Sequence, residues 1–150
     1  MDEVRSMTGF SKKGWSYSRA FDRLLDAPKG YLWLFAVCVA NSDIENGGFA
    51  QYFDNSTSIG AGHAYRALKA AGASNRATAL LRAVKSIREK GGESLKCEVD
   101  DALAADLSGA ESGELDDIAR DYSSGDRNWE ALLILHLTEY SQELFGRRQL

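Results

Sequence analysis

Residues that could act as catalysts or metal ligands are few in this chain of 150 residues. There are two histidines: His63 follows a glycine-containing segment, and His136 lies in an apolar one. Neither has a histidine, cysteine or aspartate three or four residues further on, the spacing that places two metal ligands on one helix face. Glu139 follows His136 by three residues, but we interpret His136 as a core or interface histidine. We therefore expect no metal site.

Two other patterns that occur in enzymes are incomplete here. The segment 59–63 contains a Gly-x-Gly opening but lacks the third glycine and the preceding strand of a phosphate-binding loop. The adjacent carboxylates Asp100-Asp101 and Asp116-Asp117 would point away from each other on a helix and could not easily share a substrate. We expect no catalytic residue and no cofactor, so the chain is predicted not to be an enzyme.

The carboxylates are concentrated in the C-terminal part of the chain. The formal net charge is -4, but residues 1–90 carry 13 Lys and Arg against 8 Asp and Glu, whereas residues 91–150 carry 5 against 14. The stretch 93–126 holds eleven carboxylates and only Lys96 and Arg120 as bases. This acidic stretch is the sharpest charge feature of the sequence.

Helical spacing would arrange several of these carboxylates in rows. Residues three and four apart lie above one another on a helix, about 5 to 6 Å apart, so one row and a shorter second row are predicted. Such rows could imitate the phosphates of a DNA duplex and attract a basic DNA-binding protein, with on-rates that fall as salt rises. A solvated face of any acidic protein is the alternative. The candidate partner-binding residues are Glu114, Asp117 and Asp121 in the first row, and Glu98 and Asp101 in the second.

A basic segment precedes the acidic one. It could be taken for a nucleic-acid surface, but aromatic residues are not interleaved with its bases. Intramolecular pairing with the acidic segment, or a plain charged face, is the favoured interpretation, and no direct nucleic-acid binding is expected. The bases are Arg66, Lys69, Arg76, Arg82, Lys85, Arg88 and Lys90.

The segment 44–56 reads Ile-Glu-Asn-Gly-Gly-Phe-Ala-Gln-Tyr-Phe-Asp-Asn-Ser. Asn46-Gly47-Gly48 predicts a break before a short helix, because paired glycines allow backbone angles that side chains forbid. We expect Asn46 and Asn55 to cap helix ends while three aromatic residues, Phe49, Tyr52 and Phe53, pack that helix onto its neighbours. In the alternative interpretation Gln51 and Asn55, one turn apart, face a ligand in a pocket that also includes Glu45, Tyr52 and His63.

This order of residues resembles the signature of the DMP-nineteen-like DNA-mimic protein family, formerly a domain-of-unknown-function family. The family has an Asn-Gly-Gly turn, an aromatic-Gln-Tyr/Phe-Phe helix that ends in Asn-Ser, and an Ala/Leu-rich helix that closes at Gly-Ala, here Gly72-Ala73. The match runs over residues 39–87, with a weaker echo over 115–140. The resemblance implies a bacterial cytoplasmic protein, with a homodimer as one implication, that uses carboxylates to occupy the DNA-binding surface of a transcription factor.

Helical periodicity recurs through the chain and no alternating run suggests a sheet, so we predict an all-α fold, one compact domain over 1–150 with about seven or eight helices. The last expected helix has an apolar stripe widened by Ile134 and Leu135, which makes it either central or half of a dimer face. Ser74 and Asp126 are predicted N-caps. The predicted helices span 17–25, 30–43, 48–55, 62–71, the residues from Ser74 to Gly91, 98–107, a helix carrying Leu115 to Tyr122, and 126–145.

The sequence also bears on location. The longest apolar run, 31–40, is about half of what spans a bilayer, and no apolar leader follows the N-terminus. Cys38 and Cys97 form no ligand pattern and are interpreted as reduced thiols, so a cytoplasmic protein without membrane contact is expected.

Together these features favour a non-enzymatic protein-interaction module, with DNA mimicry as its specific form. An immunity-type or regulatory protein-binding module is the first alternative. The second is a small-ligand binder or enzyme with its pocket near the Asn-Gly-Gly motif.

Overall fold

The computed structural model describes residues 16–91 and 95–146, and these residues form eight α-helices, one 3-10 helix and no strand. The predicted all-α fold is therefore confirmed. The elements are α2 (Tyr17–Leu25), α3 (Lys29–Asp54), η1 (Ser56–Gly60), α4 (Ala61–Ala70), α5 (Ser74–Glu89), α6 (Asp101–Ser108), α7 (Leu115–Ser124), α8 (Trp129–Glu139) and α9 (Ser141–Phe145).

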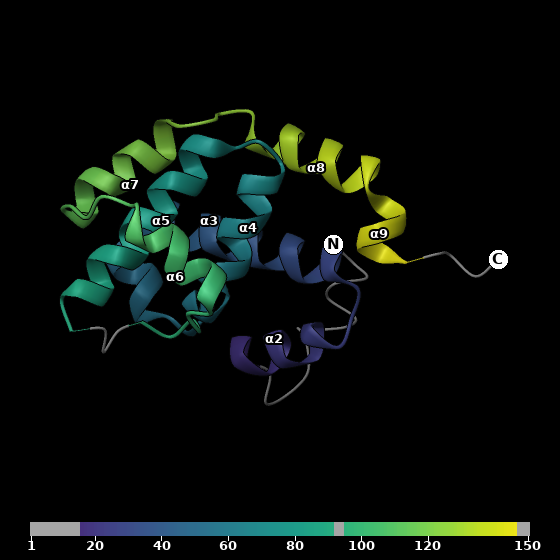
Figure 1. The fold of residues 1–150 in the computed structure, drawn as a ribbon, viewed down its shortest axis with the longest axis horizontal. Coiled ribbons are helices and arrows are strands. Elements are labelled where there is room, and N and C mark those ends of the chain that lie inside the picture. The colour runs from purple at the N-terminus through teal and green to yellow at the C-terminus, as the bar shows by residue number, and fades with distance from the viewer. Residues whose placement is uncertain (1–15, 92–94, 147–150) are drawn as a thin grey trace.

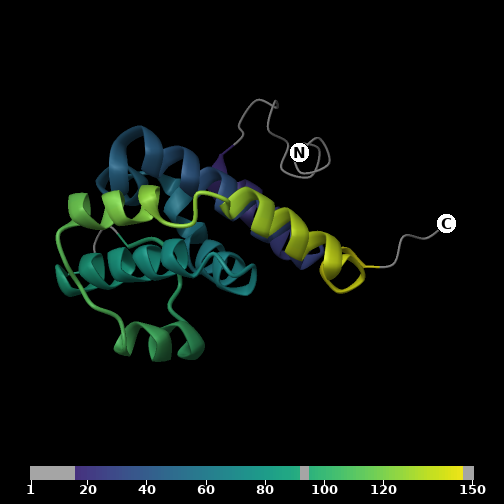
Figure 2. The same cartoon turned by 90° about the horizontal axis from the view of Figure 1, so that it is seen from above.

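The long helix α3 is the centre of the fold. It contacts α2, η1, α4, α7 and α9, whereas α5 packs against α4, α6 and α7. Figure 1 shows α7 and α8 along one edge and α2 at the opposite edge. Figure 2 shows that α6 stands apart from the layer formed by α4 and α5.

Helix α3 differs from the prediction of two helices, 30–43 and 48–55. Residues 44–47 are helical as well, and the break is confined to Gly48, whose φ of 73° and ψ of -173° lie outside the helical region. Ile44 and Phe49, on either side of the Asn-Gly-Gly segment, are 3% and 1% exposed. Their burial keeps the segment packed, so tertiary contacts override the weak helix propensity of Gly47. Glycine is needed at Gly48 because a side chain is strained at these angles.

The predicted N-caps Ser74 and Asp126 are both wrong, because Asp126 caps α5 instead of the last helix. Asp126 does not cap the last helix, which begins at Trp129 with Asn128 before it. Instead, the Asp126 carboxylate accepts hydrogen bonds from the backbone N–H groups of Asn75 and Arg76, at 2.8 and 2.9 Å. It therefore satisfies the N-terminus of α5, where Ser74 is already helical and Ala73 precedes the helix without a side-chain cap.

The C-terminal helix is also divided. Tyr140 has φ -103° and ψ 26°, which separates α8 from α9. Helix α8 lies at the edge of the fold rather than its centre, and two of its apolar side chains, Ile134 and Leu135, are 62% and 64% exposed.

Candidate functional site

The three aromatic residues of the motif anchor the second half of α3. Phe49, Tyr52 and Phe53 are at most 1% exposed, and the ring centroid of Phe49 lies 5.7 Å from that of Tyr122 in α7. Edge-to-face contacts of this kind add to the stabilisation from burial. The predicted packing role of these residues is confirmed.

The predicted capping role is wrong for Asn46, whereas Asn55 occupies the predicted cap position without a capping hydrogen bond from its side chain. Asn55 stands between α3 and η1 but makes no side-chain cap; its Nδ2 donates to Asp43 Oδ2 at 3.2 Å, and Thr57 donates to the same oxygen. Asn46 is exposed within α3, and its side chain makes no hydrogen bond to the described residues. The motif is thus a bend in one helix, with its polar side chains on the outside.

The five residues of the alternative pocket do not converge. Tyr52 is fully buried, Glu45 faces Arg76 at 3.7 Å, and Asn55 bonds to Asp43. Three cavities that described residues line, of about 470, 390 and 180 Å³, include none of the five. His63 is half-buried, and burial, followed by the charge of Arg66, lowers its pKa.

The segment 95–100 leads from the basic helices to the acidic ones and is tied to the motif. The ammonium of Lys96 donates to the backbone oxygens of Phe53 and Asp54, at 2.7 and 2.9 Å, at the C-terminal end of α3. A cation there satisfies terminal carbonyls and the helix dipole. Cys97 is 8% exposed, and burial raises the pKa of its thiol to about 11.

Helix α6 begins where this segment ends, later than predicted. Asp100 is its N-cap, with Oδ1 accepting from the N–H of Leu103 at 2.8 Å. That hydrogen bond, and then the charge of Arg66, lower the pKa of Asp100. Glu98 therefore precedes α6 and does not share a helical row with Asp101, so the predicted second row is wrong.

Four carboxylates between residues 98 and 121 are neutralised by basic side chains. Three of the bases come from α4 and α5, which confirms the predicted pairing between the basic and acidic segments. The pairs are Arg66–Asp100, Lys69–Asp106 at 3.1 Å, Arg82–Asp121 at 2.9 Å and Arg120–Asp117.

Five other carboxylates in the same stretch have no ion pair or hydrogen bond with the described residues, and all five are exposed. Nine carboxylates and Arg120 lie between residues 98 and 121, so after pairing with three bases from α4 and α5 a formal charge of -5 remains. We call these five the acidic edge: Glu98, Asp101, Glu111, Glu114 and Asp116.

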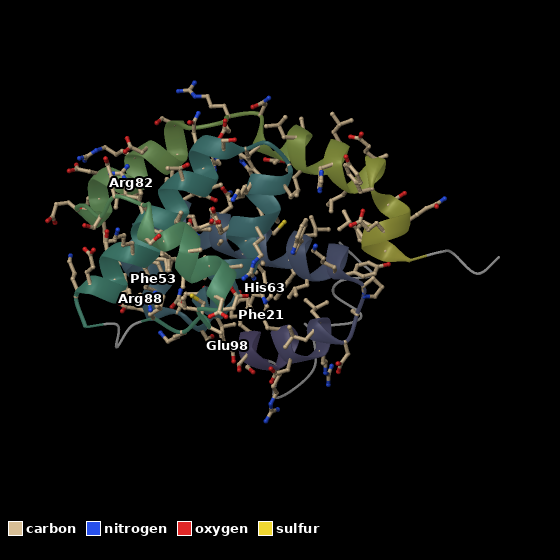
Figure 3. The ribbon with its side chains drawn as sticks, viewed as in Figure 1. Phe21, Phe53, His63, Arg82, Arg88 and Glu98 are labelled. Atoms are coloured by element: carbon tan, nitrogen blue, oxygen red, sulfur yellow. The ribbon has the colours of Figure 1, made fainter. Side chains whose placement is uncertain are left out.

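The acidic edge only partly matches the predicted set. Glu98, Asp101 and Glu114 belong to it, whereas Asp117 and Asp121 are paired, so the first predicted row keeps one free carboxylate. In the view of Figure 3, Glu98 and Arg82 lie on opposite sides of α6. By their place in the chain, the free carboxylates lie just before α6, at its first residue, in the loop before α7 and in the first turn of α7.

Comparison with protein families shows that the model described as DMP19-like protein matches residues 26–143. The chain belongs to the DMP19-like protein family. The matched range contains the Asn-Gly-Gly bend, the Lys96 contact and the whole acidic edge. The suspected family is therefore confirmed over most of the chain.

Comparison with curated proteins gave no match, and comparison with solved structures gave none either. Among helices formed by residues 16–91 and 95–146, none has the length and apolar character that a membrane span requires.

Sequence reasoning missed Glu111 and Asp116 as members of the acidic edge. Both lie in the acidic stretch, but neither falls on the predicted helical rows. The signal that distinguishes them is the absence of a base facing them. That depends on contacts between α4, α5 and the acidic segment, which the sequence does not reveal.

Sequence reasoning also missed Arg76, which it assigned to the charged surface. Arg76 is 3% exposed and lies over the rings of Tyr122 and Trp129, at 4.7 and 5.6 Å from their centroids. Its guanidinium donates to Gly125 O and Asn41 Oδ1 at 2.8 and 2.7 Å. Its buried guanidinium thus links α5 to α3 and to the turn that follows α7, an arrangement that we call the Arg76 bracket.

Proposed function

We propose that this protein is a non-enzymatic interaction module that binds the basic surface of a protein partner, of the kind a DNA-binding protein presents to duplex DNA. The observation that carries the proposal is the acidic edge: five exposed carboxylates without a base among the described residues, beside four that have one. Membership of the DMP19-like family supports the same proposal.

The distribution of these charges favours a macromolecule over an ion. No group of three or more His, Cys, Asp or Glu in the described residues is close enough together to hold a metal. Carboxylates spread along an edge instead suit a partner whose lysines and arginines are also spread out, as they are on a surface that contacts DNA phosphates.

Binding in this way predicts a strong response to salt. Exposed ion pairs are each weak, typically below about 1 kcal/mol, so the affinity depends on several acting together. Long-range attraction also falls within a Debye length of about 8 Å at physiological ionic strength. We place the protein in the cytoplasm as part of this proposal, where Cys38 and Cys97, both unpaired, would stay reduced.

The test is partner capture from a bacterial lysate on the immobilised protein, followed by elution with duplex DNA. A bound protein that DNA displaces supports mimicry. A bound protein that salt removes but DNA does not favours the alternative of an immunity-type or regulatory module. Capture is repeated with the edge variant, Glu98→Gln, Asp101→Asn, Glu111→Gln, Glu114→Gln and Asp116→Asn.

A matched control variant removes the same charge elsewhere: Asp22→Asn, Asp26→Asn, Glu130→Gln, Glu139→Gln and Glu143→Gln, all exposed and on α8, α9 or the α2 region. We expect the edge variant to lose at least about tenfold in partner affinity, since five weak pairs add up to more than one factor of ten. The control should keep binding. Equal binding by the edge variant and the native protein would refute the proposal.

A further inference from the structure

A groove of about 470 Å³ runs between α4 and α6, beside the acidic edge. Its apolar lining comes from Ala70, Ala102 and Leu103, and its polar groups include Tyr65, Lys69 and Asp106. Figure 2 shows α6 as a separate helix beside α4 and α5, and hydrogen bonds from Tyr65 and Lys69 of α4 to Asp106 of α6 join the two sides of the groove. The groove therefore combines apolar side chains with one carboxylate, Asp106, and two bases, Arg66 and Lys69.

The ammonium of Lys69 already pairs with the carboxylate of the groove. The Lys69 ammonium lies 3.1 Å from Asp106 Oδ2 and 5.7 Å from the centroid of the Tyr65 ring. The hydroxyl of Tyr65 donates to the same oxygen at 2.7 Å. A carboxylate held by a tyrosine, with the aromatic ring beneath the cation, is a favourable place for a positive charge.

The Lys69 side chain is easily displaced, whereas the Asp106 carboxylate is held by the hydrogen bond from Tyr65. The Lys69 side chain is 59% exposed, and an exposed ion pair of this kind is weak. The hydrogen bond from Tyr65, followed by that from Lys69, lowers the pKa of Asp106, so its carboxylate is ionised near neutral pH. Both hydrogen bonds end on Oδ2, and no described residue donates to Oδ1.

We propose that this groove receives an arginine side chain of the basic partner, which displaces Lys69 from Asp106. The proposal rests on the proposed function and assigns it one specific pocket. Arginine fits better than lysine, because its planar fork can use the open Oδ1 while its side chain lies against the apolar lining. The neighbouring base Arg66 is engaged with Asp100.

The experiment titrates N-acetyl-argininamide into the isotope-labelled full-length protein and follows amide and methyl shifts by NMR. N-acetyl-citrullinamide, which has the same shape without the charge, is the ligand control. We expect saturable shifts at Tyr65, Ala102 and Asp106 with the arginine compound only. Shifts that are equal for citrulline, or that lie away from the groove, would overturn the proposal.

Two variants sharpen the test. If Lys69 occupies Asp106 for between half and five-sixths of the time, as a weak exposed pair would, Lys69→Gln should tighten binding of the arginine compound about two- to sixfold. Lys90→Gln removes the same charge from an exposed lysine at the end of α5 and should leave the affinity unchanged. Asp106→Asn should abolish saturation. An equal effect of the two lysine variants would contradict displacement.

This result is independent of the partner-capture result. If the groove variants leave the titration unchanged while the edge variant loses its captured partner, the groove proposal fails and the proposed function stands. If the edge variant keeps its partner, the proposed function fails whatever the titration shows.

Discussion

Replacing Arg76 should destabilise the protein more than replacing any of its exposed basic residues. The guanidinium donates to Gly125 O, Asn41 Oδ1 and Ser123 O, and its charge lies over the rings of Tyr122 and Trp129. Methionine fills a similar volume but can donate to none of these acceptors. The substitution Arg76→Met therefore removes the bracket while leaving the apolar packing largely in place.

The magnitude follows from the groups left behind. Two half-buried acceptors, Gly125 O and Asn41 Oδ1, lose their donor, and each unpaired acceptor costs about 1 kcal/mol at the lower end of the range for buried groups. Loss of the cation–π contacts adds about 1 kcal/mol. The partner Glu45 is 48% exposed and is left solvated, so it adds little. The expected loss is about 3 kcal/mol, within the 5 to 15 kcal/mol of a typical domain, so the variant still folds.

Urea unfolding followed by circular dichroism measures this loss. With a slope of about 2 kcal/mol per molar, the midpoint should fall by about 1.5 M. Arg82→Met is the matched control, because Arg82 is 24% exposed and its partner Asp121 is 62% exposed, so its pair should contribute less than about 1 kcal/mol. Arg76→Lys keeps the charge without the fork and should recover less than half of the loss. A midpoint for Arg76→Met equal to that of Arg82→Met would refute the reasoning.

Three further predictions concern the bend, its tether and the exposed face of α8. Gly48→Ala should cost about 1 to 3 kcal/mol in urea unfolding, because Gly48 has a φ of 73°, whereas Gly109→Ala, at a φ of -94°, should be nearly neutral. Lys96→Met should cost about 1 kcal/mol and speed amide hydrogen exchange in the 95–100 segment; unchanged exchange would show that the tether does not hold it. If the exposed Ile134 and Leu135 form a homodimer face, the native protein should sediment as a dimer. The double variant Ile134→Ser and Leu135→Ser should then sediment as a monomer. A monomeric native protein would contradict this prediction.

The sequence predicts helices well where local signals and burial agree. Helix α2 has the predicted bounds because the Ser16 side chain accepts from the N–H of Arg19, and Pro28 follows shortly after the helix ends. The helices α4, α5 and α7 were also predicted, with ends shifted by a residue or two. The sequence predicts a break in α3 over residues 44–47, whereas only Gly48 departs from helical angles. The first half of α3 continues through Gly47 because Ile44 is buried.

The contacts that define the candidate site are invisible to local reasoning. Arg82 is 39 residues from Asp121, and Asp126 is 51 residues from Asn75, whose N–H it accepts. Charge counting located the acidic stretch, but neither the count nor the periodicity could show which carboxylates have a base facing them. Spacing rules also assumed that Glu98 is helical, whereas Asp100 begins the helix with its own side chain. Pairing across the fold therefore decides which charges remain available.

This pairing also bears on the proposal that a chain of low net charge binds a basic partner. The acidic region retains a formal charge of -5 after its contacts with α4 and α5, although the whole chain has only -4, so the remainder is nearly neutral. An uneven distribution of this kind produces an electric field that orients an approaching basic protein, which total charge alone would not do. Basic residues in α4 and α5 pair with three carboxylates of this region and Arg120 pairs with a fourth, so five of its nine stay available, as do exposed carboxylates of α8, α9 and the α2 region. A modest net charge is thus compatible with DNA mimicry, provided that the partner meets this edge and not the average surface.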